Sequence, residues 1–337
     1  MKSIVYEHAQ VVSLKEKELI QGNNVRLRVA YAGICGTDLN IFAGTHPRAK
    51  PGLTMGHEFS GTIEANHPTL KNGTTVTVNP LLSCGSCSSC LSGYPHVCET
   101  LELIGIDCDG GMATYVDVPA ENVVPLPETM SLRLGALTEP VAVTVHAIRQ
   151  AGYKPGDSVI IFGAGTIGLC LALTLQASGA TDIVIVETNM NRIEKAKELG
   201  FIAINPAIES VSSFIKQKTN GAGYDVVFDC AGHPAVLESV FDNVKNRGTI
   251  VIIAGYKQPA EVNLLKGMFK ELTMRFVRVY TPKDFKIAIN LLMTKQSDYD
   301  AIITHTLKPE QAADGFKLLT TPSDAVKVVF DFTEETV

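Results

Sequence analysis

Four cysteines gathered in one short segment are the first residues of this chain whose types and spacing suggest chemistry. Cys84, Cys87, Cys90 and Cys98 lie among glycines and serines, which let a short loop fold around an ion. In a chain without a secretory signal, such crowding favours metal binding over disulfide bonds. Four thiolates satisfy one tetrahedral zinc ion and leave no position for a substrate. The segment predicts a structural zinc site, and the alternative is a set of ordinary reduced cysteines.

A second set of possible ligands is spread more widely. Cys35 opens the sequence Cys35-Gly36-Thr37-Asp38, and Gly56-His57-Glu58 follows it. Taken singly, these residues are more often core or surface residues than ligands. Together, Cys35, His57 and Glu58 offer the sulfur, nitrogen and oxygen donors that a catalytic zinc with an open position uses.

A glycine-rich turn is the third feature. Gly163-Ala164-Gly165-Thr166-Ile167-Gly168 follows the apolar run Ser158–Phe162 and opens a helical segment. In this context the glycines permit a tight turn, close approach of a pyrophosphate, and packing of helix on strand. Glu187 ends the next predicted strand, where a carboxylate binds the adenosine ribose and repels a 2′-phosphate, which favours NAD over NADP. Arg192 tempers that preference, since it can stack on adenine or accept a phosphate. The alternative is a glycine turn that binds no nucleotide.

The sequence shows two patterns of secondary structure, and the possible ligands and the glycine turn fall within them. Up to about residue 130 the chain has short alternating strands and turns, which predict an antiparallel, barrel-like domain. A helix is expected over 131–151, capped by Ser131. Strands and helices then alternate, which predicts a parallel, doubly wound sheet. The expected strands are 25–29, 60–64, 74–78 and 113–118 in the first part, and 158–163, 182–187, 203–205, 225–230, 249–255 and 271–277 in the second.

The chain therefore reads as α/β, with a first domain over 1–150 and a nucleotide-binding domain over 151–280. Residues 281–337 are too few to fold alone, and we expect them to return to the first domain.

Composition excludes several classes of function. Hydrophobic residues make up 45% of the 337 residues, charged residues 19%, and the net charge is −6. Without a basic cluster, nucleic acid and anionic membranes are poor partners. The longest apolar runs have the length of buried strands, and the first residues lack the apolar core of a signal peptide. We expect a soluble, cytoplasmic protein.

The motifs together resemble the zinc-containing medium-chain alcohol dehydrogenases, in particular their sorbitol and threonine dehydrogenase branch. The matching pieces run in the family's order across most of the chain. They are Cys35-Gly36-Thr37-Asp38, Gly56-His57-Glu58, the four-cysteine loop, Asp109-Gly110-Gly111, the segment 138–147 and the glycine turn.

This resemblance implies a GroES-like catalytic domain, built from both ends of the chain, around an inserted Rossmann domain. It implies that Cys35 and His57 bind the catalytic zinc, with Glu58 as third ligand. Glu139 faces the metal directly or through water in the polyol branch, so either carboxylate is a possible ligand. Thr37 matches the hydroxyl that passes the substrate proton outward.

The resemblance also implies the cofactor contacts and the assembly. Expected contacts with NAD, besides the glycine turn, Glu187 and Arg192, come from residues at the ends of later strands: Ile253, Ala254, Val277 and Arg278. The last strand, 271–277, would leave an open sheet edge in a lone subunit. We therefore expect a homodimer or homotetramer.

Three positions depart from the family pattern. Asn40 replaces a histidine that ends the proton relay, so that water or His46 must substitute, unless His46 is only a loop residue. Ile41 replaces a tyrosine that touches the polyol in sorbitol dehydrogenases, whereas Arg278 matches an arginine near the substrate. Asn66 replaces a glycine, which is a mild change because asparagine tolerates positive φ.

The resulting prediction is a dehydrogenase with one catalytic and one structural zinc per subunit. Zinc would bind the oxygen of a secondary alcohol as a Lewis acid, and the carbon would pass a hydride to NAD. The substrate would be a polyol, a sugar acid or a related hydroxy compound. The alternatives are a zinc-free enone or quinone reductase on the same fold, and a regulatory protein without enzymatic activity.

Overall fold

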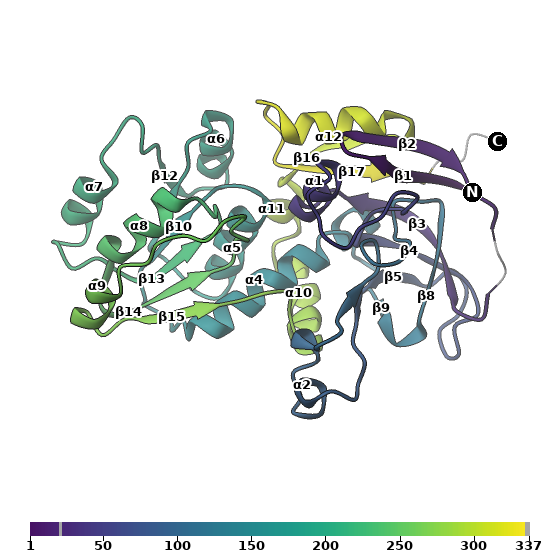
Figure 1. Ribbon diagram of the computed structural model, residues 1–337, viewed down its shortest axis with the longest axis horizontal. Coiled ribbons are helices and arrows are strands. Elements are labelled where there is room, and N and C mark those ends of the chain that lie inside the picture. The colour runs from purple at the N-terminus through teal and green to yellow at the C-terminus, as the bar shows by residue number, and fades with distance from the viewer. Residues whose placement is uncertain (20–21, 334–337) are drawn as a thin grey trace. The chain divides into compact units, whose positions relative to one another are not determined.

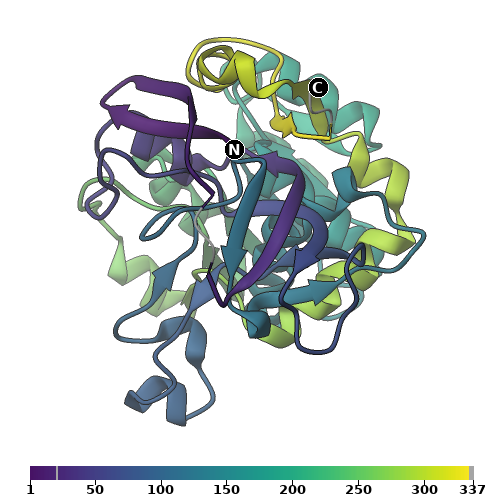
Figure 2. The same ribbon diagram turned by 90° about the vertical axis from the view of Figure 1, so that its right-hand side faces the viewer.

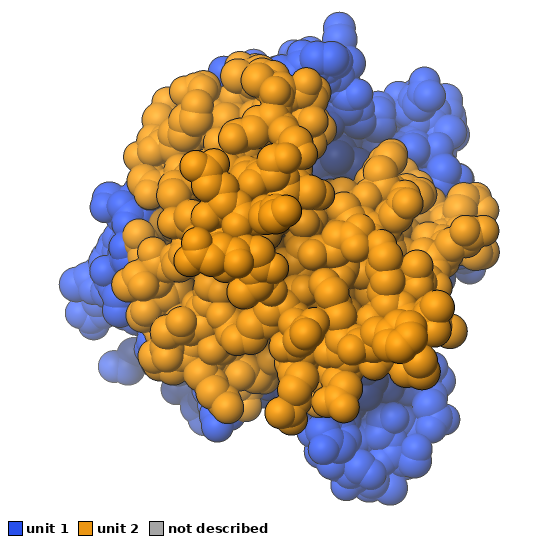
Figure 3. Space-filling view, turned by 90° about the vertical axis from the view of Figure 1, so that its left-hand side faces the viewer, with its two compact units in different colours: residues 1–140, 281–337 blue, residues 141–280 orange. Residues whose placement is uncertain are grey.

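The chain folds into two compact units. The computed structural model describes residues 1–19 and 22–333. Unit 1 comprises Met1–Pro140 and Thr281–Val337, and unit 2 comprises Val141–Tyr280. Figure 3 shows unit 1 in blue and unit 2 in orange. Both ends of the described chain thus belong to one unit, while 334–337 lie outside the described residues.

Unit 1 is built on a largely antiparallel sheet of seven strands. Its order is β16-β17-β3-β4-β5-β9, with β8 paired to β3, and only β16 and β17 are parallel. The strands and helices of this unit are β1 (Lys2–His8), β2 (Val11–Glu16), β3 (Val25–Gly33), α1 (Gly36–Phe42), β4 (Glu58–Ala65), β5 (Thr75–Val78), β6 (Leu81–Leu82), α2 (Ser88–Leu91), β7 (Glu102–Leu103), β8 (Tyr115–Val118), β9 (Val123–Pro125), α3 (Leu132–Gly135), α10 (Pro282–Thr294), α11 (Gln296–Asp300), β16 (Ile303–Leu307), α12 (Ala312–Thr320) and β17 (Lys327–Asp331).

Segments from the two ends of the chain lie together in unit 1. β17 pairs with β3, and the C-terminal helix α12 packs against β2 of the N-terminal hairpin. In Figures 1 and 2 the yellow helix α12 lies beside the purple hairpin of β1 and β2. The N-terminal segment therefore reaches its final packing only with the C-terminal one.

Unit 2 is a parallel, doubly wound sheet. Its strand order is β12-β11-β10-β13-β14-β15. Its elements are β10 (Val159–Phe162), α5 (Thr166–Ala177), β11 (Ile183–Val186), α6 (Met190–Glu198), β12 (Ile202–Ile204), α7 (Val211–Lys218), β13 (Tyr224–Asp229), α8 (Pro234–Asn243), β14 (Val244–Ile252), α9 (Leu264–Phe269) and β15 (Thr273–Phe276). All four residues of β10 and of β11 are buried, because helices cover both faces of a parallel sheet. This confirms the predicted α/β fold.

The segment 131–151 differs from the single helix predicted for it. Ser131 caps a short helix, α3, by accepting the Leu134 N–H at 3.2 Å, and a second helix, α4 (Thr138–Ala151), begins afresh. Proline lacks an N–H and is tolerated only in a first turn, so Pro140 requires a new helix start. The division between the units also falls here, at Val141 instead of residue 151. Within unit 2, Thr144 of α4 hydrogen-bonds Thr174 of α5 at 2.9 Å, which joins this helix to the nucleotide-binding domain.

Among the described residues, no helix is long and apolar enough to cross a membrane.

Candidate metal and nucleotide sites

The structure brings Cys35, His57 and Glu58 together in unit 1. Their ligand atoms all lie within 4.8 Å of one another, and His57 and Glu58 are buried. Cys35 follows β3 and caps the N-terminus of α1, while Glu58 begins β4 and pairs with Gly33 of β3 in the antiparallel sheet. One sulfur, one nitrogen and one carboxylate oxygen form a donor set that suits zinc and leaves a coordination position open. The residues fit the ion that the sequence predicts.

Asp38 orients two of these ligands. One carboxylate oxygen accepts the N–H of Cys35 at 2.8 Å and so caps α1, and the other lies 3.7 Å from His57 Nδ1. Burial alone would lower the pKa of His57, but the charges of Asp38 and Cys35 outweigh it and raise the pKa. A carboxylate beside one ring nitrogen is the usual arrangement around a metal-binding histidine, since it orients the other nitrogen toward the ion. Sequence reasoning missed this role, although the position of Asp38 three residues after Cys35 was a usable signal.

The two carboxylates considered as third ligand differ in placement. Glu58 belongs to the group of possible metal ligands, whereas Glu139 does not among the described residues. Glu139 is nevertheless buried, and its charge contributes to the raised pKa of His57. Lys327, a residue that sequence reasoning missed, donates hydrogen bonds from β17 to Glu58 and to the carbonyl oxygen of Ile34.

The residues considered for proton transfer lie on and after α1. Thr37 is half-buried in the first turn of this helix. His46 Nδ1 accepts the N–H groups of Arg48 and Ala49 at 3.4 and 3.3 Å, both long contacts. Burial, and then the charge of Arg48, lower the pKa of His46. Ile41 is only 1% exposed and packs in the core, so this position offers a substrate no polar group.

Asn66, the third departure, has a φ of 68°, which confirms that its position uses the left-handed backbone region. Its side chain donates to the carbonyl oxygens of Gly22 and Asn24.

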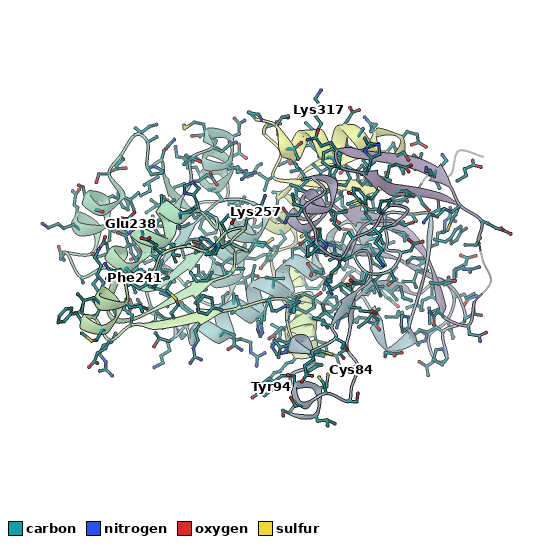
Figure 4. The ribbon with its side chains drawn as sticks, viewed as in Figure 1. Cys84, Tyr94, Glu238, Phe241, Lys257 and Lys317 are labelled. Atoms are coloured by element: carbon teal, nitrogen blue, oxygen red, sulfur yellow. The ribbon has the colours of Figure 1, made fainter. Side chains whose placement is uncertain are left out.

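The four clustered cysteines form a second group of possible ligands. Their sulfur atoms lie within 4.8 Å of one another, with Cys84 and Cys90 Sγ atoms 4.0 Å apart. Figure 4 labels Cys84 and Tyr94 on this loop. Hydrogen bonds from the backbone and side chain of Ser86, and from the N–H of Cys87, lower the pKa of Cys84 to about 5. N–H groups that stabilise a thiolate favour metal binding, so the loop fits a closed zinc site.

In unit 2, the residues expected to bind the cofactor follow four strands at the same edge of the sheet. Gly163 follows β10 and Glu187 follows β11, while Ile253 and Ala254 follow β14, and Val277 and Arg278 follow β15. The chain order reverses between β10 and β13, and such a reversal is where doubly wound sheets bind dinucleotides.

The glycine turn has the geometry that its spacing predicts. Gly163 has a φ of 101°, and a Cβ atom on Gly168 would lie 1.9 Å from the Gly163 carbonyl oxygen. Gly165 caps α5, where a phosphate meets helix N–H groups. Glu187 is 8% exposed and accepts the Ala164 N–H at 2.7 Å, so its carboxylate is fixed beside the turn. The Arg192 guanidinium lies near Gly165: its Nη1 atom is 3.8 Å from the position that a Cβ atom on Gly165 would occupy.

Comparisons with known proteins agree with both sites. Residues 21–128 match the alcohol dehydrogenase GroES-like domain, and residues 166–294 match the zinc-binding dehydrogenase domain. The chain is 34% identical to the 2-dehydro-3-deoxy-L-galactonate 5-dehydrogenase of Pseudoalteromonas atlantica, over 88% of this chain and 90% of that protein. It is 31% identical to the L-galactonate-5-dehydrogenase of Escherichia coli, over 90% and 91%. A solved alcohol dehydrogenase of Escherichia coli CFT073 in complex with NADH is 30% identical, with a TM-score of 0.90 over 98% and 99% of the two chains.

These matches support an alcohol oxidoreductase with zinc and NAD as cofactors, and they do not favour a zinc-free reductase or a regulatory protein. The chain belongs to the zinc-dependent medium-chain dehydrogenases, in the branch that contains the polyol and threonine dehydrogenases.

Proposed function

We propose that this dehydrogenase oxidises a secondary hydroxyl group of a sugar acid or polyol, with Cys35, His57 and Glu58 as ligands of the catalytic zinc. The convergence of these three donors in a chain that also carries a nucleotide-binding sheet is the observation that carries the proposal. The names of two relatives, both dehydrogenases acting at carbon 5 of a galactonate, favour a sugar acid. The cysteine loop would hold a second, structural zinc.

The roles of the protein groups follow from their placement. The ion, when bound, supplies the Lewis acidity that lowers the pKa of a substrate alcohol. Asp38 holds His57 and the Cys35 backbone in place. The Thr37 hydroxyl both donates and accepts hydrogen bonds and so suits passage of the released proton. The glycine turn and Glu187 orient the cofactor.

A screen for NAD reduction tests this function. Sugar acids, polyols and L-threonine would be offered to the zinc-loaded protein with NAD. We expect turnover of at least one sugar acid or polyol that carries a secondary hydroxyl group. Activity confined to simple primary alcohols, or to enones with NADPH, would contradict the proposal.

We expect wild-type protein to prefer NAD to NADP in kcat/KM by about 100-fold or more, because a fixed carboxylate repels a 2′-phosphate. Glu187→Gln keeps an oxygen for the Ala164 N–H but removes the charge, so it should narrow the preference mainly by improving NADP use. Glu187→Ala, which also loses the contact with the turn, should weaken NAD use as well. Equal use of the two cofactors by wild type would mean that Arg192 dominates over Glu187.

We also propose that His46 takes part in the exit of the proton, with water, in place of Asn40. Its lowered pKa keeps the imidazole neutral above that value, and this proton-accepting form is lost as the pH falls through it. His46→Ala should therefore slow kcat/KM mainly between the lowered pKa of His46 and neutral pH, where wild type still has a neutral imidazole and hydroxide is scarce, with partial rescue by small added bases. Asn40→His should be neutral or faster. A pH profile of His46→Ala that matches wild type would leave water alone in this role.

The subunit is further proposed to assemble in the cytoplasm as a homodimer or homotetramer through β15. In the described part of the chain β15 pairs with β14 alone, and large apolar side chains of β15 and of the preceding helix α9 are exposed. Phe276 on β15 is 75% exposed, as is Phe269 on α9, and Leu264 is 77% exposed. Unpaired edges with exposed apolar residues are typical of subunit contacts.

Sedimentation of variants tests the assembly. Phe276→Asp and Leu264→Asp should shift the protein toward monomer at micromolar concentration. Ile208→Asp is the matched control, since Ile208 is also 77% exposed but lies between β12 and α7, and it should leave the assembly unchanged. A wild-type protein that sediments as a monomer would contradict this assembly.

A further inference from the structure

A buried lysine from the C-terminal strand meets the carboxylate proposed as the third zinc ligand. Lys327 on β17 and Glu58 on β4 are each only 1% exposed. The Lys327 Nζ donates a hydrogen bond to Glu58 Oε2 and another, at 2.9 Å, to the carbonyl oxygen of Ile34. Burying a charged pair carries a large desolvation penalty, and removal of one partner leaves the other charge uncompensated. This contact therefore constrains both side chains strongly.

The backbone between the two residues makes room for them. Gly33 on β3 pairs with Glu58 of β4 on one side and with Val329 of β17 on the other. A Cβ atom at Gly33 would lie 2.6 Å from Glu58 Oε2 and 2.7 Å from Lys327 Cε. No larger residue fits without displacing the pair. The lysine–glutamate contact is thus accommodated by three strands.

With a metal ion bound, the Glu58 carboxylate would lie between two cations, the ion and Lys327. Glu58 belongs to the ligand group with Cys35 and His57, yet one of its oxygens already accepts a hydrogen bond from Lys327. A catalytic zinc site needs an open position for the substrate oxygen. A glutamate that bound the metal through both carboxylate oxygens would fill that position and exclude the substrate.

We propose that Lys327 is a positioning residue that holds one oxygen of Glu58, so that the carboxylate binds the metal through a single oxygen and the fourth coordination position stays open for a substrate. The inference rests on the proposed function, because it assumes that Glu58 faces the catalytic ion. Lys327 then acts only through Glu58. It lowers the affinity of the site for zinc and, by keeping a position free for the substrate, raises kcat.

Lys327→Met, which removes the charge but keeps an unbranched side chain of similar length, tests this role in the full-length protein. Competition with a chelator measures the Kd of the catalytic zinc, which is identified as the ion that is missing from the Cys35→Ser variant. Steady-state kinetics with NAD measures kcat. We expect Lys327→Met to bind this zinc about 10-fold more tightly and to lower kcat by about 10- to 100-fold, the range seen when groups behind metal ligands change. Lys327→Arg, which keeps the charge, should recover most of both properties.

The same substitution in a Glu58→Gln background separates positioning from a structural role. If Lys327 acts through Glu58, Lys327→Met should then change zinc affinity and kcat by less than about threefold. This double variant also lacks the uncompensated carboxylate, so it keeps the test available if Lys327→Met alone folds poorly.

Unchanged or weaker zinc binding in Lys327→Met, or an equal effect in both backgrounds, would overturn the inference. A wild type that binds two zinc ions but oxidises no alcohol would contradict the proposed function instead, while the zinc affinities still decide the role of Lys327.

Discussion

Replacing Cys35 by serine is expected to lower kcat by about 1000-fold or more while the protein stays folded. A serine hydroxyl is a poor zinc ligand, and loss of the ion removes several kcal/mol of stabilisation from the charge that develops on the substrate oxygen. The zinc content, measured by atomic emission, should fall from two ions per chain to one. The unfolding temperature should change little, because Cys35 follows a strand that the sheet already holds on both sides.

Cys108→Ser is the matched control for that experiment. Cys108 is an exposed cysteine of the same unit that belongs to neither group of possible ligands. It should keep both zinc ions and wild-type turnover. Activity of Cys35→Ser within tenfold of wild type would show that Cys35 is not a ligand of the catalytic ion.

Replacing Cys90 by serine should have the opposite pattern, with a large loss of stability and a small effect on the chemistry of the folded fraction. The loop that carries the cysteines contains short elements such as α2, so we expect its fold to depend on the proposed zinc ion. Binding free energy at a structural zinc site is folding free energy, and we expect a loss on the order of several kcal/mol. Thermal unfolding followed by circular dichroism measures this loss, and a chelator should reproduce it in wild type. Equal loss of stability in Cys35→Ser and Cys90→Ser would contradict the two separate roles.

The parts of the fold that depend on nearby residues could be predicted from the sequence. The alternation of strands and helices in unit 2 could be predicted because each buried strand is a short apolar run followed by a helical segment. β10 and β11 lie within the ranges predicted for them, whereas β14 begins at Val244, before the predicted 249. Both ligand groups were visible because their residue types are rare and their spacing is specific.

Contacts between distant residues could not be predicted, and two local signals were missed. Lys327 stands in an apolar run and gave no sign of a partner, because its contact with Glu58 requires the register of β17, β3 and β4. The short helix α1 escaped notice because its start depends on Asp38 accepting the Cys35 N–H, a contact that periodicity does not reveal. Pro140 was a local signal for the break between α3 and α4, but the pattern of apolar residues across 131–151 outweighed it.

The pairing of β17 with β3 has a consequence for biosynthesis. Lys327 and Glu58 are separated by 269 positions, so the ribosome must add all the residues between them before these strands can meet. Unit 2 is continuous in sequence and can fold first, since domains generally fold as they emerge. A nascent chain stalled before β17 would leave Tyr31–Gly33 of β3 without this pairing and carry Glu58 without its lysine. We therefore expect completion of the proposed catalytic centre to be a late event in the synthesis of this fold.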